Sequence, residues 1–255
     1  MNTGQLPQGS FLPGRILAVP SWVFPGTLAE NCRFLAGRVD EVGLLFLQAF
    51  PPAGAEEDPP ADVPRLPLRY HLHLPLDLPW EDPAGAARVC RLLREKTSVF
   101  GPLRAVLHPP PHGPDEERSL ASFLDGLAAG GEDPRLLLLE NTPDNDLGSL
   151  VALVREYGLR VCMDMGHILA WGQEDLVRRD DLLERTDLLH LSAPGAAGDG
   201  HLPLTALDAR GVALARRLLR AAPREAVIML ELFQWSGVEE SLPLLRQWLE
   251  SSGSP

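Results

Sequence analysis

The chain lacks the features of a secreted or membrane-anchored protein. Its 255 residues include only three cysteines, Cys32, Cys90 and Cys162, and no CxxC pair. This odd, scattered set argues against a disulfide framework and indicates buried core thiols in a reducing compartment. No apolar run reaches the roughly 18 residues of a membrane helix, and the opening MNTGQLPQGSF has neither the basic nor the apolar region of a signal peptide. We therefore expect a cytoplasmic protein with no membrane partner.

Excess positive charge and nucleotide-binding motifs are also missing. The formal net charge is −12 at pH 7, and an acidic surface repels phosphate backbones, so we expect no nucleic-acid partner. The chain contains no Walker A, GxGxxG or GxSxG pattern. A Rossmann-type nucleotide site and a serine-hydrolase nucleophile are therefore both disfavoured.

What the chain does contain is a regular alternation of apolar runs and amphipathic stretches. Its 45% hydrophobic content can bury one large core, and its 25 prolines and 23 glycines indicate many tight connections. Eight strand-like runs are separated by roughly the length of a βα unit. The fold class predicted is a single eight-stranded parallel (β/α)₈ barrel of the TIM type that spans residues 1–255.

The predicted elements can be placed by residue number. The strands are expected at 15–19, 42–47, 69–74, 103–108, 135–140, 159–164, 187–192 and 227–232. Amphipathic helices are expected at 83–96, 117–129, 146–156, 173–184, 208–221 and 238–250. The proline-rich segment 51–67 is predicted to be a surface loop in place of a helix, and the tail 251–255 to be frayed.

Histidine or acidic residues stand at the ends of most of these apolar runs. Alternate residues of a strand share a face, so an apolar residue and the polar residue two positions later both point into the barrel. Five strands carry such a pair: Val106 and His108, Leu138 and Glu140, Cys162 and Asp164, Leu188 and His190, Met229 and Glu231. The polar member of each pair is predicted at the C-terminal mouth, where barrel enzymes keep their active sites.

Three further features extend this predicted cluster. On the third strand His71 and His73 have the same parity; we prefer His73 as a ligand because it lies nearer the mouth, and read His71 as a core histidine or a residue that orients a ligand. The sequence Asp164-Met165-Gly166-His167 places an imidazole at the start of the following loop. The sequence Asp199-Gly200-His201 adds another acid and histidine in a glycine-rich loop.

This mixture of imidazole and carboxylate predicts a divalent metal centre. Nitrogen and oxygen donors without a convincing thiolate suit Zn²⁺ best, with Mn²⁺, Fe²⁺ or Co²⁺ as alternatives. Nine candidate ligands are too many for one tetrahedral ion, so between one and three ions are expected per chain. Clustered ions are well suited to phosphoryl transfer, which favours a hydrolase.

Seven short motifs of this chain resemble those of the xylose isomerase-like, AP-endonuclease-type TIM barrels. They are HLP (73–75), LHP (107–109), LEN (139–141), CMDMGH (162–167), HLSAP (190–194), DGH (199–201) and LEL (230–232). The resemblance covers about residues 70–232. In the endonuclease branch, three zinc ions are held by a ligand set that is matched in type and order here. The resemblance therefore implies as metal ligands His73, His108, Glu140, Asp164, His167, His190, Asp199, His201 and Glu231.

Other strings resemble one branch of that family, the cobamide-remodelling phosphodiesterases. They are SWVFPGTLAEN (21–31), YHLHLPLDLPW (70–80), LHPP (107–110) and DGHLPL (199–204). This resemblance implies hydrolysis of the nucleotide loop of a corrinoid, a small-molecule partner, with Glu140, Glu231 and Asp199 as catalytic residues.

Substrate-binding residues are predicted around the mouth. Four tryptophans that follow predicted strands can pack a large apolar ligand or simply cover the loops: Trp22, Trp80, Trp171 and Trp235. The polar candidates for substrate contact are Ser21, Asn31, Asn141 and Ser192. Asn141 can equally cap the next turn.

Three other functions remain open. The first is a sugar isomerase or epimerase with one metal ion; it is weakened by Gln48, because related isomerases often carry a carboxylate at the end of the second strand. The second is an AP endonuclease-like nuclease, which the acidic charge disfavours. The third is a carrier without catalysis.

Arg69 and Arg104 begin strands, at the wrong end of a barrel for phosphate binding, and are expected to be structural. The sequence makes no prediction of oligomeric state.

Overall fold

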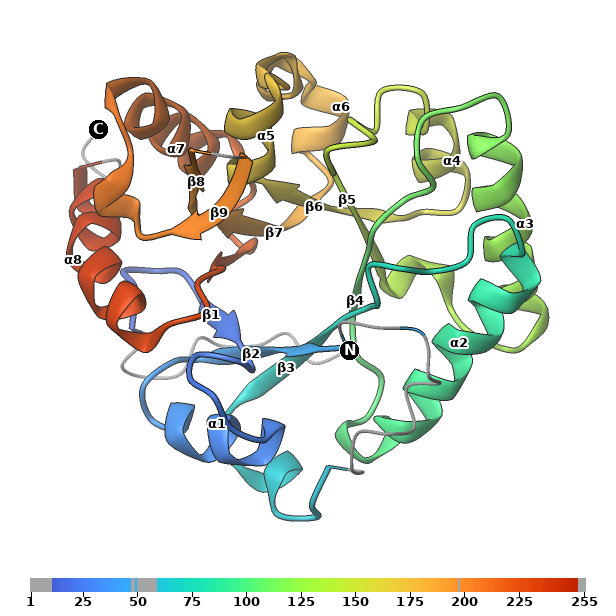
Figure 1. Cartoon of the computed structure of the whole chain (residues 1–255), viewed down its shortest axis with the longest axis horizontal. Coiled ribbons are helices and arrows are strands. Elements are labelled where there is room, and N and C mark those ends of the chain that lie inside the picture. Colours follow the sequence, from blue (N-terminus) through green and yellow to red (C-terminus); the bar gives the residue numbers. More distant parts are fainter. Residues whose placement is uncertain (1–10, 47–48, 50–58, 197, 252–255) are drawn as a thin grey trace.

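The computed structural model describes residues 11–46, 49, 59–196 and 198–251. Its centre is a closed barrel of eight parallel strands surrounded by helices (Figure 1). Around the barrel the order is β1-β10-β7-β6-β5-β4-β3-β2. The strands are β1 (Leu17–Pro20), β2 (Glu41–Leu45), β3 (Arg69–His73), β4 (Ala105–Leu107), β5 (Leu137–Glu140), β6 (Arg160–Asp164), β7 (Thr186–Leu191) and β10 (Val227–Leu230). Each overlaps a predicted strand, so the (β/α)₈ fold class is confirmed.

Four outer helices lie where the amphipathic pattern predicts them, and their starts have clear physical causes. They are α2 (Pro83–Lys96), α3 (Glu116–Ala129), α7 (Ala209–Ala221) and α8 (Trp235–Ser251). Asp82 caps α2 by accepting a hydrogen bond from the Gly85 amide, and Asp208 caps α7 in the same way through Gly211. These side chains satisfy amide groups that the first turn of a helix leaves without a partner.

Other predicted elements are corrected by the structure. The predicted helix 146–156 is shortened to α4 (Val151–Glu156), and 173–184 is divided into a 3₁₀ turn, η4 (Glu174–Arg178), and α6 (Asp180–Leu183). His167 does not lie in a loop, because β6 continues directly into α5 (Met165–Trp171). His201 lies in a short antiparallel hairpin, β8 (Ala193–Gly195) with β9 (Gly198–Leu202). The helix α1 (Leu28–Leu35), which begins with a Thr27–Glu30 capping box, was not predicted.

Two separate apolar clusters stabilise the fold. The larger fills the space between the barrel and its helices, with Phe123, Leu72 and Leu107 among its fully buried members. The smaller lies inside the barrel: Ile16, Ala18, Val106, Leu138, Cys162, Leu188, Val227 and Met229. All five apolar members of the predicted inward-facing pairs belong to this inner cluster. The strand parity read from the sequence is therefore confirmed.

The connection after β2 is described only in part. Residues 59–62 have no regular structure and lead into a single 3₁₀ turn, η1 (Val63–Arg65), so this part contains no α-helix. Gln48, most of the proline-rich segment and residues 252–255 of the tail lie outside the described residues. No helix within the described ranges has both the length and the apolar character needed to cross a membrane.

Candidate metal centre

Four side chains from four neighbouring strands meet at the C-terminal mouth of the barrel. They are Glu140 at the end of β5, Asp164 at the end of β6, His190 in β7 and Glu231 directly after β10. Each offers one ligand atom, and these atoms all lie within 4.8 Å of one another. All four residues are buried. Four of the five polar strand ends that the sequence singles out thus form one cluster.

The imidazole of His190 is the centre of this cluster. Its Nδ1 atom lies 3.0 Å from Oε1 of Glu140, 3.1 Å from Oε2 of Glu231 and 3.6 Å from Oδ2 of Asp164. A single N–H can donate one good hydrogen bond, so it cannot neutralise three carboxylates. The arrangement therefore concentrates negative charge in a buried space.

The pKa values of the cluster reflect this crowding. Burial opposes ionisation of Glu140 and Glu231, but the nearby His190 charge outweighs it, so the pKa of Glu231 falls to about 2 and that of Glu140 lies well below its usual range. Burial raises the pKa of Asp164. For His190, burial favours the neutral form, but Glu231 and Glu140 hold its pKa well above its usual value. Without a cation, a proton on His190 balances part of the carboxylate charge.

The donor set fits a divalent cation. Four buried atoms of the cluster make no hydrogen bond to any described residue: Oε2 of Glu140, Oδ2 of Asp164, Nε2 of His190 and Oε2 of Glu231. Buried polar atoms without partners are costly unless an unseen ion or water satisfies them. Three carboxylates and one imidazole suit Mn²⁺, Fe²⁺, Co²⁺ or Zn²⁺. Which of these metals binds stays a prediction.

A second group of possible ligands shares Glu140 with the first. Oε2 of Glu140 lies 3.3 Å from Nε2 of His73 and 3.1 Å from Nε2 of His108. These three residues also bring their ligand atoms within 4.8 Å of one another. Glu140 therefore faces His190 with one oxygen and the two other histidines with the second. His73 and His108 either orient Glu140 or hold a further ion with it.

The remaining predicted ligands lie around the rim. His167 is in the first turn of α5, and its Nδ1 donates a hydrogen bond to the Asn141 carbonyl at 2.7 Å. His201 lies 3.7 Å from Oε2 of Glu231 and packs edge-on against Phe233. Asp199 lies in β9, but its side chain is outside the described part, so its roles as ligand and catalytic base stay predictions.

Two predicted substrate residues are occupied with the chain itself. The side chain of Asn31 accepts hydrogen bonds from the amides of Val23 and Phe24 and donates to the carbonyls of Phe24 and Thr27. The side chain of Asn141 hydrogen-bonds to the backbone amide and carbonyl of Asp164, and its Nδ2 donates to Oε1 of Gln173. These hydrogen bonds give both side chains a structural role, and substrate contact through them stays a prediction.

The two serines differ from these asparagines. Ser21 accepts a hydrogen bond from the Leu45 amide at 3.0 Å and so ties the end of β1 to β2. Ser192 is buried just after β7, and its hydroxyl has no hydrogen-bond partner among the described residues. Substrate contact by either serine stays a prediction.

The four predicted tryptophans differ in exposure and in their ring contacts. Trp80 packs edge-on against the core residue Phe123, and Trp235 packs edge-on against Phe34, so both half-buried rings contact helices. Trp22 and Trp171 are 46% and 39% exposed. Trp171 also packs 5.4 Å, centre to centre, from the ring of His167. Substrate contact by any of the four tryptophans stays a prediction.

Sequence reasoning missed a charged group at the opposite end of the barrel. Glu41, at the start of β2, is buried and lies 2.7 Å from Nδ1 of His71, 3.2 Å from Arg69 and 3.3 Å from Arg104. Burial lowers the pKa of His71, so the neutral ring donates to Glu41. The structural reading of His71, Arg69 and Arg104 agrees with these contacts. The sequence signal that could have found Glu41 is its position in the strand: it lies an even number of residues before Gly43 and Leu45, so all three residues share one face of β2.

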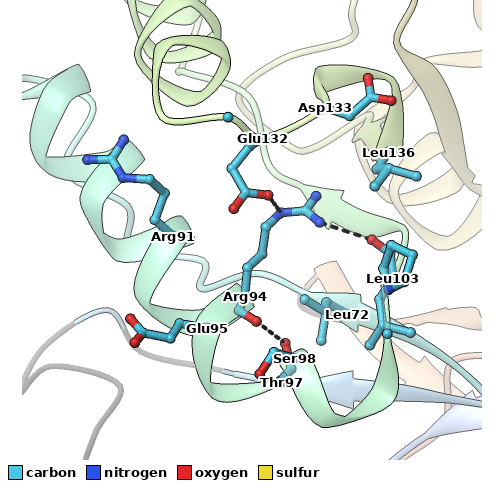
Figure 2. A pocket seen from close by; sticks show the side chains of 13 residues that line it. Leu72, Arg91, Arg94, Glu95, Thr97, Ser98, Leu103, Glu132, Asp133 and Leu136 are labelled. Atoms are coloured by element: carbon cyan, nitrogen blue, oxygen red, sulfur yellow. Dashed lines mark hydrogen bonds and ion pairs between the residues drawn. The ribbon is translucent and has the colours of Figure 1, made fainter.

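A cavity of about 680 Å³ also lies at that opposite end, between the C-terminal parts of α2 and α3 (Figure 2). Arg94 occupies its middle, where it pairs with Glu132 at 3.2 Å and donates to the Leu103 carbonyl at 3.2 Å. Apart from Leu72 of β3, its lining residues belong to the segments that lead into β4 and β5. The cavity is therefore separate from the carboxylate–histidine cluster at the mouth.

Comparison with known proteins shows similarity of fold. The chain matches no protein-family model and no curated protein sequence. Similar solved structures include a D-tagatose 3-epimerase-like protein, with 17% identity over 93% of this chain and 98% of that chain and a TM-score of 0.67. The IolI protein with a bound zinc atom has 12% identity over 93% and 96%, with a TM-score of 0.61. A D-allulose 3-epimerase from Methylomonas sp. in complex with D-allulose has 14% identity over 95% of both chains, with a TM-score of 0.58.

These comparisons correct the expected reaction class. Two of the three structures are named for sugar epimerases, and none is named for a hydrolase. The prediction of a phosphodiesterase is therefore wrong, and the corrinoid partner that depended on it has no support. What the comparisons show directly is that the chain shares its (β/α)₈ barrel fold with these solved structures.

Proposed function

We propose that this protein is a metal-dependent isomerase or epimerase that acts on a small polyhydroxy carbonyl compound of the ketose class. The observation that carries the proposal is the convergence of Glu140, Asp164, His190 and Glu231 at the barrel mouth. Support comes from similar structures, one of which contains zinc and another D-allulose. Barrel enzymes place their chemistry at this end of the strands.

The four converging residues would hold one divalent cation. Such a cation, when bound, polarises a carbonyl group and makes the neighbouring C–H bond more acidic. Asp164 is the most firmly positioned of the four, because its Oδ1 accepts a hydrogen bond from the His167 amide at 2.6 Å and its own amide donates to Asn141 at 2.7 Å. A fixed carboxylate of this kind suits a ligand role.

Glu140 and Glu231 are the proposed acid–base pair. They lie on β5 and directly after β10, two strands that are separated by β6 and β7, so they approach the centre from different sides. One carboxylate takes the proton from the carbon beside the carbonyl, and the other returns a proton. Return to the opposite face of the same carbon gives an epimer, and transfer to the neighbouring carbon gives an isomer. His73 and His108 contact Oε2 of Glu140 and would hold it in place.

The experiment uses purified protein that is stripped with a chelator and reloaded separately with Mn²⁺, Co²⁺ and Zn²⁺. Each form is incubated in deuterated water with a panel of pentuloses and hexuloses, and the sugars are followed by NMR. We expect metal-dependent deuterium incorporation beside the carbonyl of at least one sugar, together with a new stereoisomer.

The matched variants are Glu140→Gln and Glu231→Gln, with Glu156→Gln as a control because Glu156 lies exposed on α4. The first two should lose exchange, and the control should retain it. If wild-type protein binds a cation but exchanges no proton on any ketose, the proposed reaction is wrong.

A further inference from the structure

Cys162 borders the proposed cation centre from inside the barrel. It lies in β6, where its Cα is paired with that of Glu140 across the sheet. Its sulfur lies within 4.8 Å of a carboxylate oxygen of Glu140 and of a ring nitrogen of His190. The two other cysteines lie in α1 and α2, in the outer core. Cys162 is therefore the cysteine that adds a third donor type to the oxygen and nitrogen atoms of the centre.

Packing alone accounts for only part of this position. Cys162 belongs to the inner apolar cluster with Leu138 and Leu188, where a buried cysteine packs as a small apolar side chain. The sulfur lies at ligand spacing from one atom of Glu140 and one atom of His190. Both of these side chains also have a buried atom that forms no hydrogen bond to any described residue, Oε2 of Glu140 and Nε2 of His190. A buried sulfur beside such groups is in a position to bind the same cation as Glu140 and His190.

We propose that Cys162 supplies a sulfur donor to the cation held by Glu140 and His190, and so makes the centre prefer thiophilic ions. Sulfur ligands favour Zn²⁺, Co²⁺ and Cd²⁺ over Mn²⁺ and Mg²⁺, whereas carboxylates alone favour the harder ions. On coordination the sulfur exchanges its proton for the cation, and the proton leaves to the buffer. The inference rests on the cation centre of the proposed function, and it adds the choice of metal.

The test is the absorption spectrum of the full-length protein loaded with Co²⁺. A cobalt–sulfur bond gives a near-ultraviolet charge-transfer band that oxygen and nitrogen ligands do not give. We expect this band in wild-type protein and in Cys90→Ala, the control for loss of a buried cysteine away from the centre. It should be absent from Cys162→Ala and Cys162→Ser, which should still bind Co²⁺ through the remaining ligands.

Metal competition gives a second readout that does not depend on turnover. Removal of the sulfur should lower the ratio of Cd²⁺ to Mn²⁺ affinity by at least about tenfold, within the range known for changes around metal sites. If Cys162→Ala does not fold, cadmium NMR of the wild-type protein decides, because a sulfur ligand moves the cadmium resonance strongly downfield.

The outcomes separate this inference from the proposed function. Wild-type protein that binds Co²⁺ without the charge-transfer band, or variants that keep the Cd²⁺ to Mn²⁺ ratio, would overturn the sulfur ligand and leave the ketose reaction standing. Wild-type protein that binds none of these cations would overturn both. A charge-transfer band without turnover of any ketose would support the sulfur ligand and count against the reaction alone.

Discussion

Nδ1 of His190 lies 3.0 Å from Oε1 of Glu140, although the strands that carry them are separated by β6. The two side chains meet because both point into the barrel, across the end of the strand that carries Asp164. The same nitrogen lies 3.1 Å from Glu231. One imidazole is thus placed where a cation can be shared by three carboxylates, and this placement leads to the first prediction.

Cation affinity should rise with pH. Burial works against the charged imidazole, but Glu231 and Glu140 raise the pKa of His190 well above its usual value. A cation must displace that proton, so affinity should increase by about tenfold per pH unit below the pKa and level off above it. Competition with a fluorescent chelator over a pH series measures the slope. An affinity that does not change with pH would show that His190 takes no part in binding.

Asn141→Ala should weaken both the fold and the centre. Its side chain satisfies the buried amide and carbonyl of Asp164 at 2.7 Å and 3.0 Å, and their loss should cost about 1–3 kcal/mol of unfolding free energy. Asn31→Ala is the matched control, because Asn31 is equally buried but braces the loop after β1. Both variants should be less stable in denaturant titration, and only Asn141→Ala should lose cation affinity. Equal cation affinity in the two variants would contradict the inference that Asn141 positions Asp164 for cation binding.

Glu41 should make the fold sensitive to acid. Burial opposes its charge, but the hydrogen bond from His71 and the charges of Arg104 and Arg69 lower its pKa from 4.5 to about 2. A depressed carboxyl pKa adds stability that is complete above 4.5 and is lost as the pH falls toward 2. Glu41→Gln should therefore lose about 3 kcal/mol at neutral pH and show a flatter decline in acid. Denaturant titrations at neutral and acid pH measure the unfolding free energy of Glu41→Gln, with the exposed Glu156→Gln variant as the control.

Gly43→Ala should be destabilising because a histidine fills the space beside it. A Cβ at this position would lie 2.8 Å from Nε2 of His71 and 3.2 Å from Cε of Met229. Both neighbours are buried, so the clash should cost about 1–3 kcal/mol. Gly126→Ala in α3 is the opposite case: its Cβ would meet Ala87 at an ordinary 3.4 Å, and helix propensity should make it neutral or stabilising. Thermal unfolding should show a lower melting temperature for Gly43→Ala and an unchanged or higher one for Gly126→Ala. A stable Gly43→Ala would contradict the tight packing around His71.

The sequence predicts the barrel and its inward face because period-two alternation is a local property. Val106, Leu138 and Met229 lie in the inner cluster, two residues before the polar ends of their runs. The same logic fails where one residue belongs to two elements. Asp164 both ends β6 and caps α5, so the sequence predicts a loop at Gly166, where the structure has the first turn of α5.

Side-chain partners across the fold are harder to predict, because tertiary contacts determine them. Trp80 meets Phe123 from another helix, and Asn31 folds back on its own loop. Neither contact leaves a pattern in the local sequence. The reaction class is harder still, because the same carboxylates and histidines fit both hydrolysis and proton transfer.

The most direct test is anomalous diffraction from crystals grown with Mn²⁺ or Co²⁺. The structure predicts one strong anomalous peak in contact with Glu140, Asp164, His190 and Glu231. A cation held elsewhere, or none at these four residues in wild-type crystals, would contradict the shared cation centre.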